Sequence, residues 1–144
     1  MKNFIKVIAG VAILSVTACS DAPIAVTATD ICNEEFKNVL VTTEGTIQLP
    51  DSFYSAGGSV TMLLETPKGK FRAPAIKIRT FNKDGEKKNM MEQLKDGFTE
   101  ADVKIYDDKG QVVKLGDKIR VTGEVVGASK EWCDINVDKI EKIN

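Results

Sequence analysis

Apolar and polar residues alternate most regularly between Gly116 and Val126. Ile119, Val121 and Val125 share one face with Gly123, and the residues between them are mostly charged or hydroxylated. A period of two is the pattern of a half-buried strand, which predicts a strand over 118–126. A glycine inside such a strand indicates a bulge, a bend or the close approach of another backbone.

The same alternation recurs in several other segments, separated by turn-forming residues. The two segments 103–106 and 111–115 flank a glycine-containing turn over 107–110, which predicts a hairpin. Pro74 within the third segment indicates an edge or a bulge near its start. The predicted strands are 39–49, 60–66, 71–81, 103–106, 111–115, 118–126, and a last one that starts at Trp132 or Cys133.

Two segments carry helical patterns instead. Asp30–Lys37 begins with a capping residue and has acids in its first turn, which predicts a short helix. Glu86–Asp96 is followed by Gly97, a residue suited to a helix end, and has a one-sided apolar stripe. We interpret Met90 and Met91 in that stripe as barrel-filling side chains, and a soft-metal or partner surface is the alternative.

The order of these elements predicts the fold class. We expect an all-β domain, a small five-stranded Greek-key barrel of the OB (oligonucleotide/oligosaccharide-binding) type. A short helix would lie between its strands 3 and 4, together with an additional hairpin. The chain has 144 residues, which suits one domain.

The N-terminal residues form a leader rather than part of the domain. Lys2 and Lys6 precede an apolar run, Val7–Val16, that is too short to span a membrane. The next residues, Val16-Thr17-Ala18-Cys19, resemble the lipobox of bacterial lipoproteins. The alternative is an ordinary secretory signal that is cut elsewhere. We therefore expect a signal peptide over 1–18, a lipidated tether over 19–29 and the OB domain over 30–144.

The lipobox resemblance implies a location and a membrane partner. Cys19 would carry lipid, including palmitate, and would hold the protein on the bacterial cell envelope. Ser20 follows the cysteine. By resemblance to envelope lipoproteins, the absence of aspartate at this position favours the outer membrane over retention in the inner membrane. If the cell has two membranes, we expect the outer membrane, on its periplasmic face.

Composition narrows the range of functions. Removing residues 1–18 takes away two lysines and no acid, so the net charge moves from −1 to −3. A mildly acidic domain does not favour indiscriminate nucleic-acid binding. The chain contains no histidine, which excludes histidine-based catalysis and histidine metal sites.

Cys32 and Cys133 remain after Cys19 is assigned to lipid. An even pair in an exported chain predicts a disulfide bond, because disulfides persist outside the cytoplasm. The alternative is two separate buried thiols. No CxxC motif is present, so we interpret the pair as structural rather than redox-active.

A family likeness is carried by KLGDKIRVTGEVV and the later CDINVDKIEKI. Together they resemble the fourth and fifth strands of OB-fold domains of the tRNA-anticodon-binding-like type. Gly45 in the first strand fits the same pattern, and the likeness covers residues 38–143. Exported lipoproteins with domains of this type are known, mostly as uncharacterised proteins. The resemblance implies the fold, and it leaves the ligand open because OB domains bind oligonucleotides, sugars and proteins alike.

The usual OB ligand face lies on strands 2 and 3 and two nearby loops. Aromatic and cationic residues at these places suit single-stranded nucleic acid, yet aromatics make up just 6% of the chain and do not alternate with cations. We interpret them first as solvated or barrel-packing side chains. The candidate ligand face consists of Phe53, Tyr54, Lys77, Arg79, Lys130 and Trp132.

Other chemistry is less favoured. Asp134, Asn136 and Asp138 offer oxygen ligands to calcium. However, alternate strand positions lie about 7 Å apart, and the spacing lacks the glycine and the distal glutamate of a calcium-binding loop. A carboxylate-pair hydrolase stays an alternative. We expect no enzyme, no metal and no cofactor. The predicted function is a lipid-anchored envelope binding module for an envelope protein or glycan, with an oligonucleotide or other polyanion as the alternative and the oligomeric state open.

Overall fold

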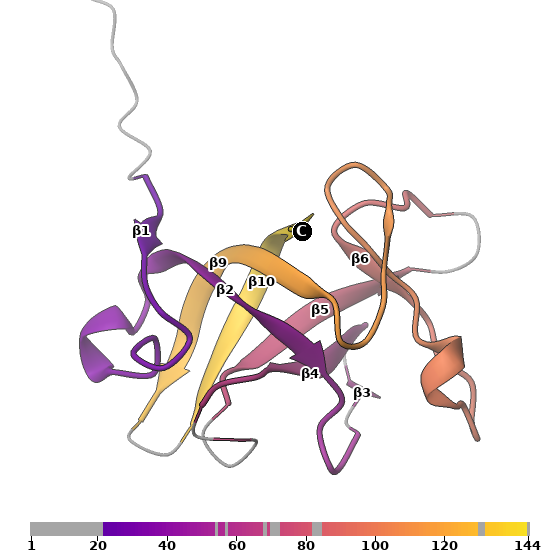
Figure 1. The fold of residues 1–144 in the computed structure, drawn as a ribbon, viewed down its shortest axis with the longest axis horizontal. Helices are drawn as coiled ribbons and strands as arrows, with labels where there is room; N and C mark the ends of the chain where they lie inside the picture. Colours follow the sequence, from indigo (N-terminus) through magenta and orange to yellow (C-terminus); the bar gives the residue numbers. More distant parts are fainter. Residues whose placement is uncertain are drawn as a thin grey trace, which may run out of the picture.

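The computed structural model describes residues 22–53, 55–56, 58–67, 69, 73–81, 85–129 and 132–143. Cys19, Tyr54 and Lys130 lie outside these residues, as does the predicted leader. The strands β2 (Leu40–Gln48), β4 (Ser59–Leu64), β5 (Ala75–Phe81), β9 (Lys118–Ala128) and β10 (Cys133–Lys142) make up the barrel. They cross the centre of the view in Figure 1.

The pairing of these strands closes the barrel. β2 pairs antiparallel with β9 along 40–46 and with β4 at 47–48, and β4 pairs antiparallel with β5. β5 pairs parallel with β10, and β10 returns antiparallel to β9. This is a five-stranded Greek-key barrel of the OB type, and the predicted all-β fold class is confirmed.

Buried aliphatic side chains fill the barrel, as the alternation in the sequence predicted. Each barrel strand alternates buried and more exposed residues along most of its length, so one side of each strand faces the core. Among the fully buried side chains are Val41, Ile47, Met62, Leu64, Ile76, Ile78, Ile119, Ile135 and Ile140.

Two glycines permit close approaches inside the barrel. A Cβ on Gly123 would collide with the carbonyl group of Asn136 on β10, and a Cβ on Gly45 would lie 3.1 Å from Cβ of Leu64. The register between β10 and β9 shifts at Val137–Lys139, which leaves Asp138 as an extra residue in the ladder. The prediction of a bulge or close backbone approach at Gly123 is confirmed.

Short elements surround the barrel. β1 (Ile24–Ala25) lies within the predicted tether and pairs in parallel with the start of β2. β3 (Ser55–Ala56) pairs with the start of β4 and lies between the first two predicted strands, 39–49 and 60–66. The helix predicted over Asp30–Lys37 is wrong, because turns lead there into a single 3-10 turn, η1 (Glu34–Phe36). Its N-cap residue, Asn33, makes no side-chain capping bond.

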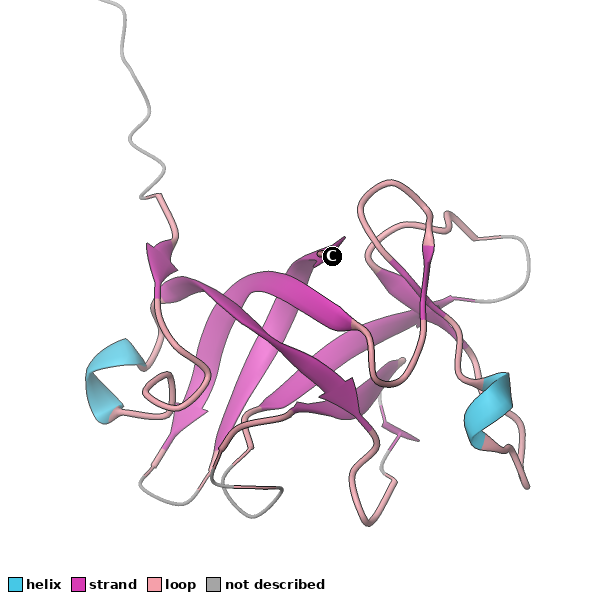
Figure 2. Cartoon of the chain, viewed as in Figure 1, coloured by secondary structure: helices cyan, strands magenta, loops and turns pink. Residues whose placement is uncertain are grey.

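The helix predicted over Glu86–Asp96 is also wrong. β6 (Met90–Glu92) occupies that segment and pairs with the end of β5 and with β7 (Ile105–Tyr106). Asn89, just before β6, has a positive φ of 52°, a conformation that does not continue into a helix. Helical structure in the described part of this region is limited to η3 (Glu100–Asp102), which Figure 2 draws in cyan to the right of the barrel.

The predicted hairpin is present, with shorter strands. β7 pairs with β8 (Val112–Val113) across a turn at Asp107–Gly110. Asp107 is 2% exposed, and its Oδ1 accepts hydrogen bonds from the backbone N–H groups of Lys109 and Gln111. We call residues 85–113, which contain β6, η3, β7 and β8, the insertion. It lies to the right of the barrel in Figure 1.

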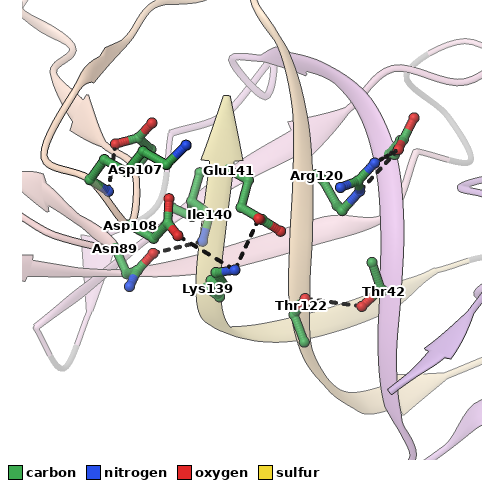
Figure 3. Close-up of polar contacts among 11 residues, drawn as sticks. Thr42, Asn89, Asp107, Asp108, Arg120, Thr122, Lys139, Ile140 and Glu141 are labelled. Carbon is green, nitrogen blue, oxygen red and sulfur yellow. Dashed lines mark hydrogen bonds and ion pairs between the residues drawn. The ribbon is translucent and has the colours of Figure 1, made fainter. Parts of the chain in front are cut away.

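Polar bonds fix the insertion to β10. Asn89 Oδ1 accepts a hydrogen bond of 2.7 Å from the Ile140 backbone N–H, and the Asp108 N–H donates to the Ile140 carbonyl at 2.8 Å. Lys139 lies 3.4 Å from a carboxylate oxygen of Asp108 and 2.9 Å from one of Glu141 (Figure 3). These bonds hold the insertion against the bulged part of β10.

Candidate binding face

The strand register aligns outward-facing polar residues in rows across the barrel. Thr61 on β4, Lys77 on β5 and Asn136 on β10 are successive register partners, and Asn136 pairs onward with Glu124 on β9. A neighbouring row runs through Leu63, Ala75, Asp134 and Gly127. We call the outer surface formed by Trp132, Asp134, Asn136, Lys77, Glu124 and Thr61 the binding face.

Lys77 is paired within this face. Its Nζ lies 2.6 Å from Oδ2 of Asp134, and the two side chains are 36% and 19% exposed. The register partner of Lys77 on β10 is Asn136, so the ion pair runs diagonally to Asp134, two residues earlier on that parallel strand. The positive charge of Lys77 is therefore offset where a phosphate would have to bind.

Trp132 is the largest exposed apolar side chain among the described residues, at 55% exposure. Its ring lies against Gly127 on β9, since a Cβ on that glycine would come within 2.8 Å of the ring atom Cζ3. The backbone N–H of Ser129 donates to the Trp132 carbonyl at 2.9 Å, and the Trp132 N–H donates to Ser129 Oγ at 3.2 Å. These bonds fix the backbone that carries the indole, and the ring rests on Gly127 while the residue stays exposed.

The structure brings together part of the predicted ligand face. Lys77, Arg79 and Trp132 lie on or beside the outer surface of β5 and β10. Phe53 lies elsewhere: it is half-buried, and its ring packs 4.5 Å from that of Phe98 near the insertion. Arg79 is exposed and takes part in none of the ion pairs among the described residues.

The sequence pattern did not mark the acids of this face as part of the ligand face. It offered Asp134, Asn136 and Asp138 as disfavoured calcium ligands, whereas in the structure Asp134 is held by Lys77 and Asp138 occupies the bulge. Their outward parity and the adjacency of strands 3 and 5 in an OB barrel were a sufficient signal to place them beside Lys77. Among the described residues, no three His, Cys, Asp or Glu side chains are grouped so that they could hold a metal ion.

The outer surface of β2 and β9 is more fully paired. Arg120 Nη2 donates to Glu44 Oε1 at 2.7 Å, Lys118 lies 3.4 Å from the other oxygen of Glu44, and the hydroxyls of Thr42 and Thr122 are 3.0 Å apart (Figure 3). The hydrogen bond from Arg120 lowers the pKa of Glu44. This surface offers fewer unused polar groups to a ligand than the binding face does.

The predicted disulfide is present and supports the binding face. Cys32 and Cys133 are bonded, with their Cα atoms 5.1 Å apart and 101 positions apart in sequence. Cys133 is fully buried at the start of β10, next to Trp132. The bond ties the segment before η1 to the strand that carries Asp134 and Asn136.

Comparisons with known proteins give little beyond this geometry. No family model matches the chain, and no curated protein is significantly similar to it. Among solved structures, one that it resembles is described as an aspartyl-tRNA synthetase from Leishmania major Friedlin, with a TM-score of 0.49 and 11% sequence identity. The match covers 94% of this chain and 23% of that one. The fold assignment rests on the strand pairing of the barrel. No helix in the described part of the chain is long and apolar enough to cross a membrane.

Proposed function

We propose that this protein is a non-catalytic, lipid-anchored module of the bacterial cell envelope that binds a glycan on its binding face. The observation that supports this most is the exposed Trp132 ring, seated on Gly127 beside the Lys77–Asp134 pair. Sugars present a face of C–H groups that packs on an indole, and their hydroxyls need both donors and acceptors at its edge. Lys77, Asp134, Asn136 and Thr61 supply both kinds of group.

The charge of the face favours an uncharged ligand. Lys77 is paired with Asp134, and Glu124 lies two strands away on β9. With Arg79, at the next outward position on β5, the formal charges of these four residues sum to zero. A polyanion would meet two carboxylates where it needs cations, and a polycation would meet two cations. A neutral polysaccharide meets neither obstacle, so we favour a neutral or N-acetylated glycan.

The absence of catalysis belongs to the same proposal. The chain has no histidine, and Asp134 of the binding face is held by Lys77. Glycoside hydrolysis needs two carboxyl groups facing one bond, one of them protonated. The Asp134 carboxylate is instead paired with Lys77, and no second carboxyl group of the described binding face is placed opposite it.

A sedimentation experiment tests glycan binding. The purified full-length protein is mixed with insoluble chitin, an N-acetylglucosamine polymer, and with insoluble cell-wall glycan. We expect co-sedimentation that Trp132→Ala abolishes and Val112→Ala leaves unchanged, since Val112 is exposed on the distant β8. Binding that survives Trp132→Ala would contradict the proposed face.

The anchor is tested separately by mass spectrometry. A mature protein that begins with acylated Cys19 and partitions with membranes is the expected result. An unmodified chain that starts at another residue would refute the anchor and would leave the glycan test intact. Retention on heparin or single-stranded DNA at physiological salt, lost in Lys77 and Arg79 variants, would favour the polyanion alternative.

A further inference from the structure

The chain joins the barrel only a few residues after the predicted lipid site. β1 pairs in parallel with the start of β2, with Ile24 opposite Val41 and Ala25 opposite Thr42. The backbone N–H of Val26 then donates to the Thr42 carbonyl at 2.9 Å. Residues 24–26 therefore belong to the folded domain, and they do not act as a free linker.

The residues after β1 fix the other end of this segment. Thr27 Oγ1 donates to Asp30 Oδ2 at 2.7 Å, and the Ile31 backbone N–H donates to the Thr27 carbonyl at 3.1 Å. Ile31 is fully buried, and the next residue, Cys32, is bonded to Cys133. Both ends of the segment 24–32 are thus held on the barrel, so β1 keeps its place unless the strand pairing breaks.

The segment that contains β1 presents an uncharged and partly apolar surface. Residues 22–29 include no Asp, Glu, Lys or Arg. Ile24 is 51% exposed, and its neighbours Ala22, Pro23 and Ala25 are exposed as well. Exposed apolar side chains gain free energy by entering the interface of a bilayer, and this segment brings no charge that would have to lose water there.

The covalent chain limits how the domain can turn relative to a membrane. Cys19, to which the proposed function assigns the lipid, is five positions before Ile24. Five extended residues span at most about 18 Å, whereas a small domain is about 30 Å across. The end of the barrel that carries β1 must therefore stay near the membrane surface.

The binding face begins at another end of the barrel. In Figure 1, β1 lies at the upper left, whereas the end of β9 and the start of β10 lie at the lower left. Trp132 is located between these two strand ends, directly before Cys133. A membrane that meets β1 therefore leaves the tryptophan uncovered.

We propose that the β1 end of the barrel rests on the phospholipid surface, with Ile24 among the lipid headgroups and Trp132 directed away from the membrane. This inference rests on the proposed lipidation of Cys19 and goes further, because it gives the anchored module one orientation. The contact is apolar, so it does not require anionic lipid. In this orientation the glycan face is presented to the compartment beyond the membrane.

NMR of the lipidated protein tests this orientation. The full chain is expressed with isotope labels, purified from the membrane fraction and placed in phosphatidylcholine nanodiscs that carry a gadolinium chelate on some headgroups. Gadolinium broadens nearby amide signals, so we expect loss of the signals of residues 24–26 and 41–42. The signals of residues 127–128 and 133–134 should remain. Adding phosphatidylglycerol should leave this pattern unchanged.

Three variants separate the apolar contact from the covalent leash. Ile24→Ser should restore part of the lost signals, and Ile24→Leu, which keeps an apolar side chain, should behave as the parent protein does. Ten glycine and serine residues inserted after Asp21 add a flexible reach of about 18 Å and should restore most of them. Ile24→Ser with an unchanged pattern would contradict the insertion of Ile24.

The outcomes distinguish this inference from the proposed function. Equal signal loss at both ends of the barrel, or loss at residues 127–134 alone, would overturn the orientation and leave the anchor and the glycan face standing. A chain that is not acylated and does not stay with the nanodiscs would refute the anchor, and the orientation with it. Co-sedimentation with chitin needs no membrane, so its result is independent of both.

Discussion

The ammonium group of Lys77 lies 2.6 Å from a carboxylate oxygen of Asp134, on the neighbouring strand of the barrel. Lys77 was a candidate cation for nucleic acid when the sequence was read alone. In the folded chain its charge is opposed, and the surface around it offers donors and acceptors in a balanced set. That relationship turns the interpretation of this face from a polyanion platform to one for neutral polar ligands.

The ion pair predicts how the protein responds to polyanions. Asp134→Asn removes the carboxylate charge and releases Lys77 beside Arg79, so the variant should elute from heparin at higher salt than the parent protein. Asn136→Asp, which adds an acid in the next outward position, should elute at lower salt. Salt-gradient chromatography measures both. Identical elution of parent and Asp134→Asn would show that the pair does not control polyanion binding.

The Cys32–Cys133 bond closes a loop across nearly the whole barrel. Replacing both residues by serine should lower the free energy of unfolding by about 3–5 kcal/mol, because the unfolded chain regains the entropy of a loop of 101 positions. Denaturant unfolding of the two proteins measures the difference, and the parent protein in reductant is the matched control. A loss below about 1 kcal/mol would contradict the stabilising role.

Gly123 has a steric role that its neighbours lack. Gly123→Ala places a methyl group against the Asn136 carbonyl, so β9 and β10 must separate, and we expect a loss of about 1–3 kcal/mol. Glu124→Ala, on the next and exposed position of the same strand, should change stability by less than about 0.5 kcal/mol. Thermal unfolding compares the two variants. Equal effects would refute the close approach of β10.

Asp117 gives the fold a dependence on pH. Its Oδ2 accepts hydrogen bonds from the Lys114 backbone N–H at 2.9 Å and from Lys142 Nζ at 2.7 Å, and these bonds lower the pKa of Asp117. Because the pKa of Asp117 is lower in the folded than in the unfolded protein, the ionised carboxylate stabilises the fold when the pH is above the unfolded pKa of about 3.9. That stabilisation is lost as the pH falls through the folded pKa.

Asp117→Asn should therefore cost about 1 kcal/mol at neutral pH and progressively less below about pH 4. Unfolding by urea across this pH range measures the difference. Lys142→Gln keeps the backbone bond and should show a smaller loss over the same range. A difference that stays constant down to the most acid pH would contradict the assignment to Asp117.

Period-two alternation predicted most of the barrel because it reports directly which side of a strand is buried. The close backbone approach at Gly123 and the Cys32–Cys133 bond could also be predicted. A glycine inside an alternating strand indicates such an approach, and an even pair of cysteines in an exported chain indicates a disulfide. The segment 86–96 was misread because Met90, Met91 and Leu94 fit a helical stripe as well as a short strand. What decided it was non-local: pairing with β5 and β7, and the positive φ of Asn89.

Only the aromatic and cationic residues of the binding face could be predicted from the sequence. Exposed aromatic and cationic residues can be found by position on predicted strands, and Lys77, Arg79 and Trp132 were. The acids near Lys77 come from β9 and β10, about 45 to 60 residues away in the chain, so placing them beside Lys77 needs the strand order of the barrel as well as the local alternation.

The most direct test of the glycan face uses the single tryptophan of the chain, because Trp132 reports on its own site. Chitotetraose, a neutral N-acetylglucosamine oligosaccharide, is titrated into the full-length protein while the tryptophan emission is recorded. We predict a saturable blue shift that Lys77→Ala with Asp134→Ala abolishes, although that variant keeps the fluorophore. Emission that does not change with chitotetraose, or that changes equally in the double variant, would contradict glycan binding at this face.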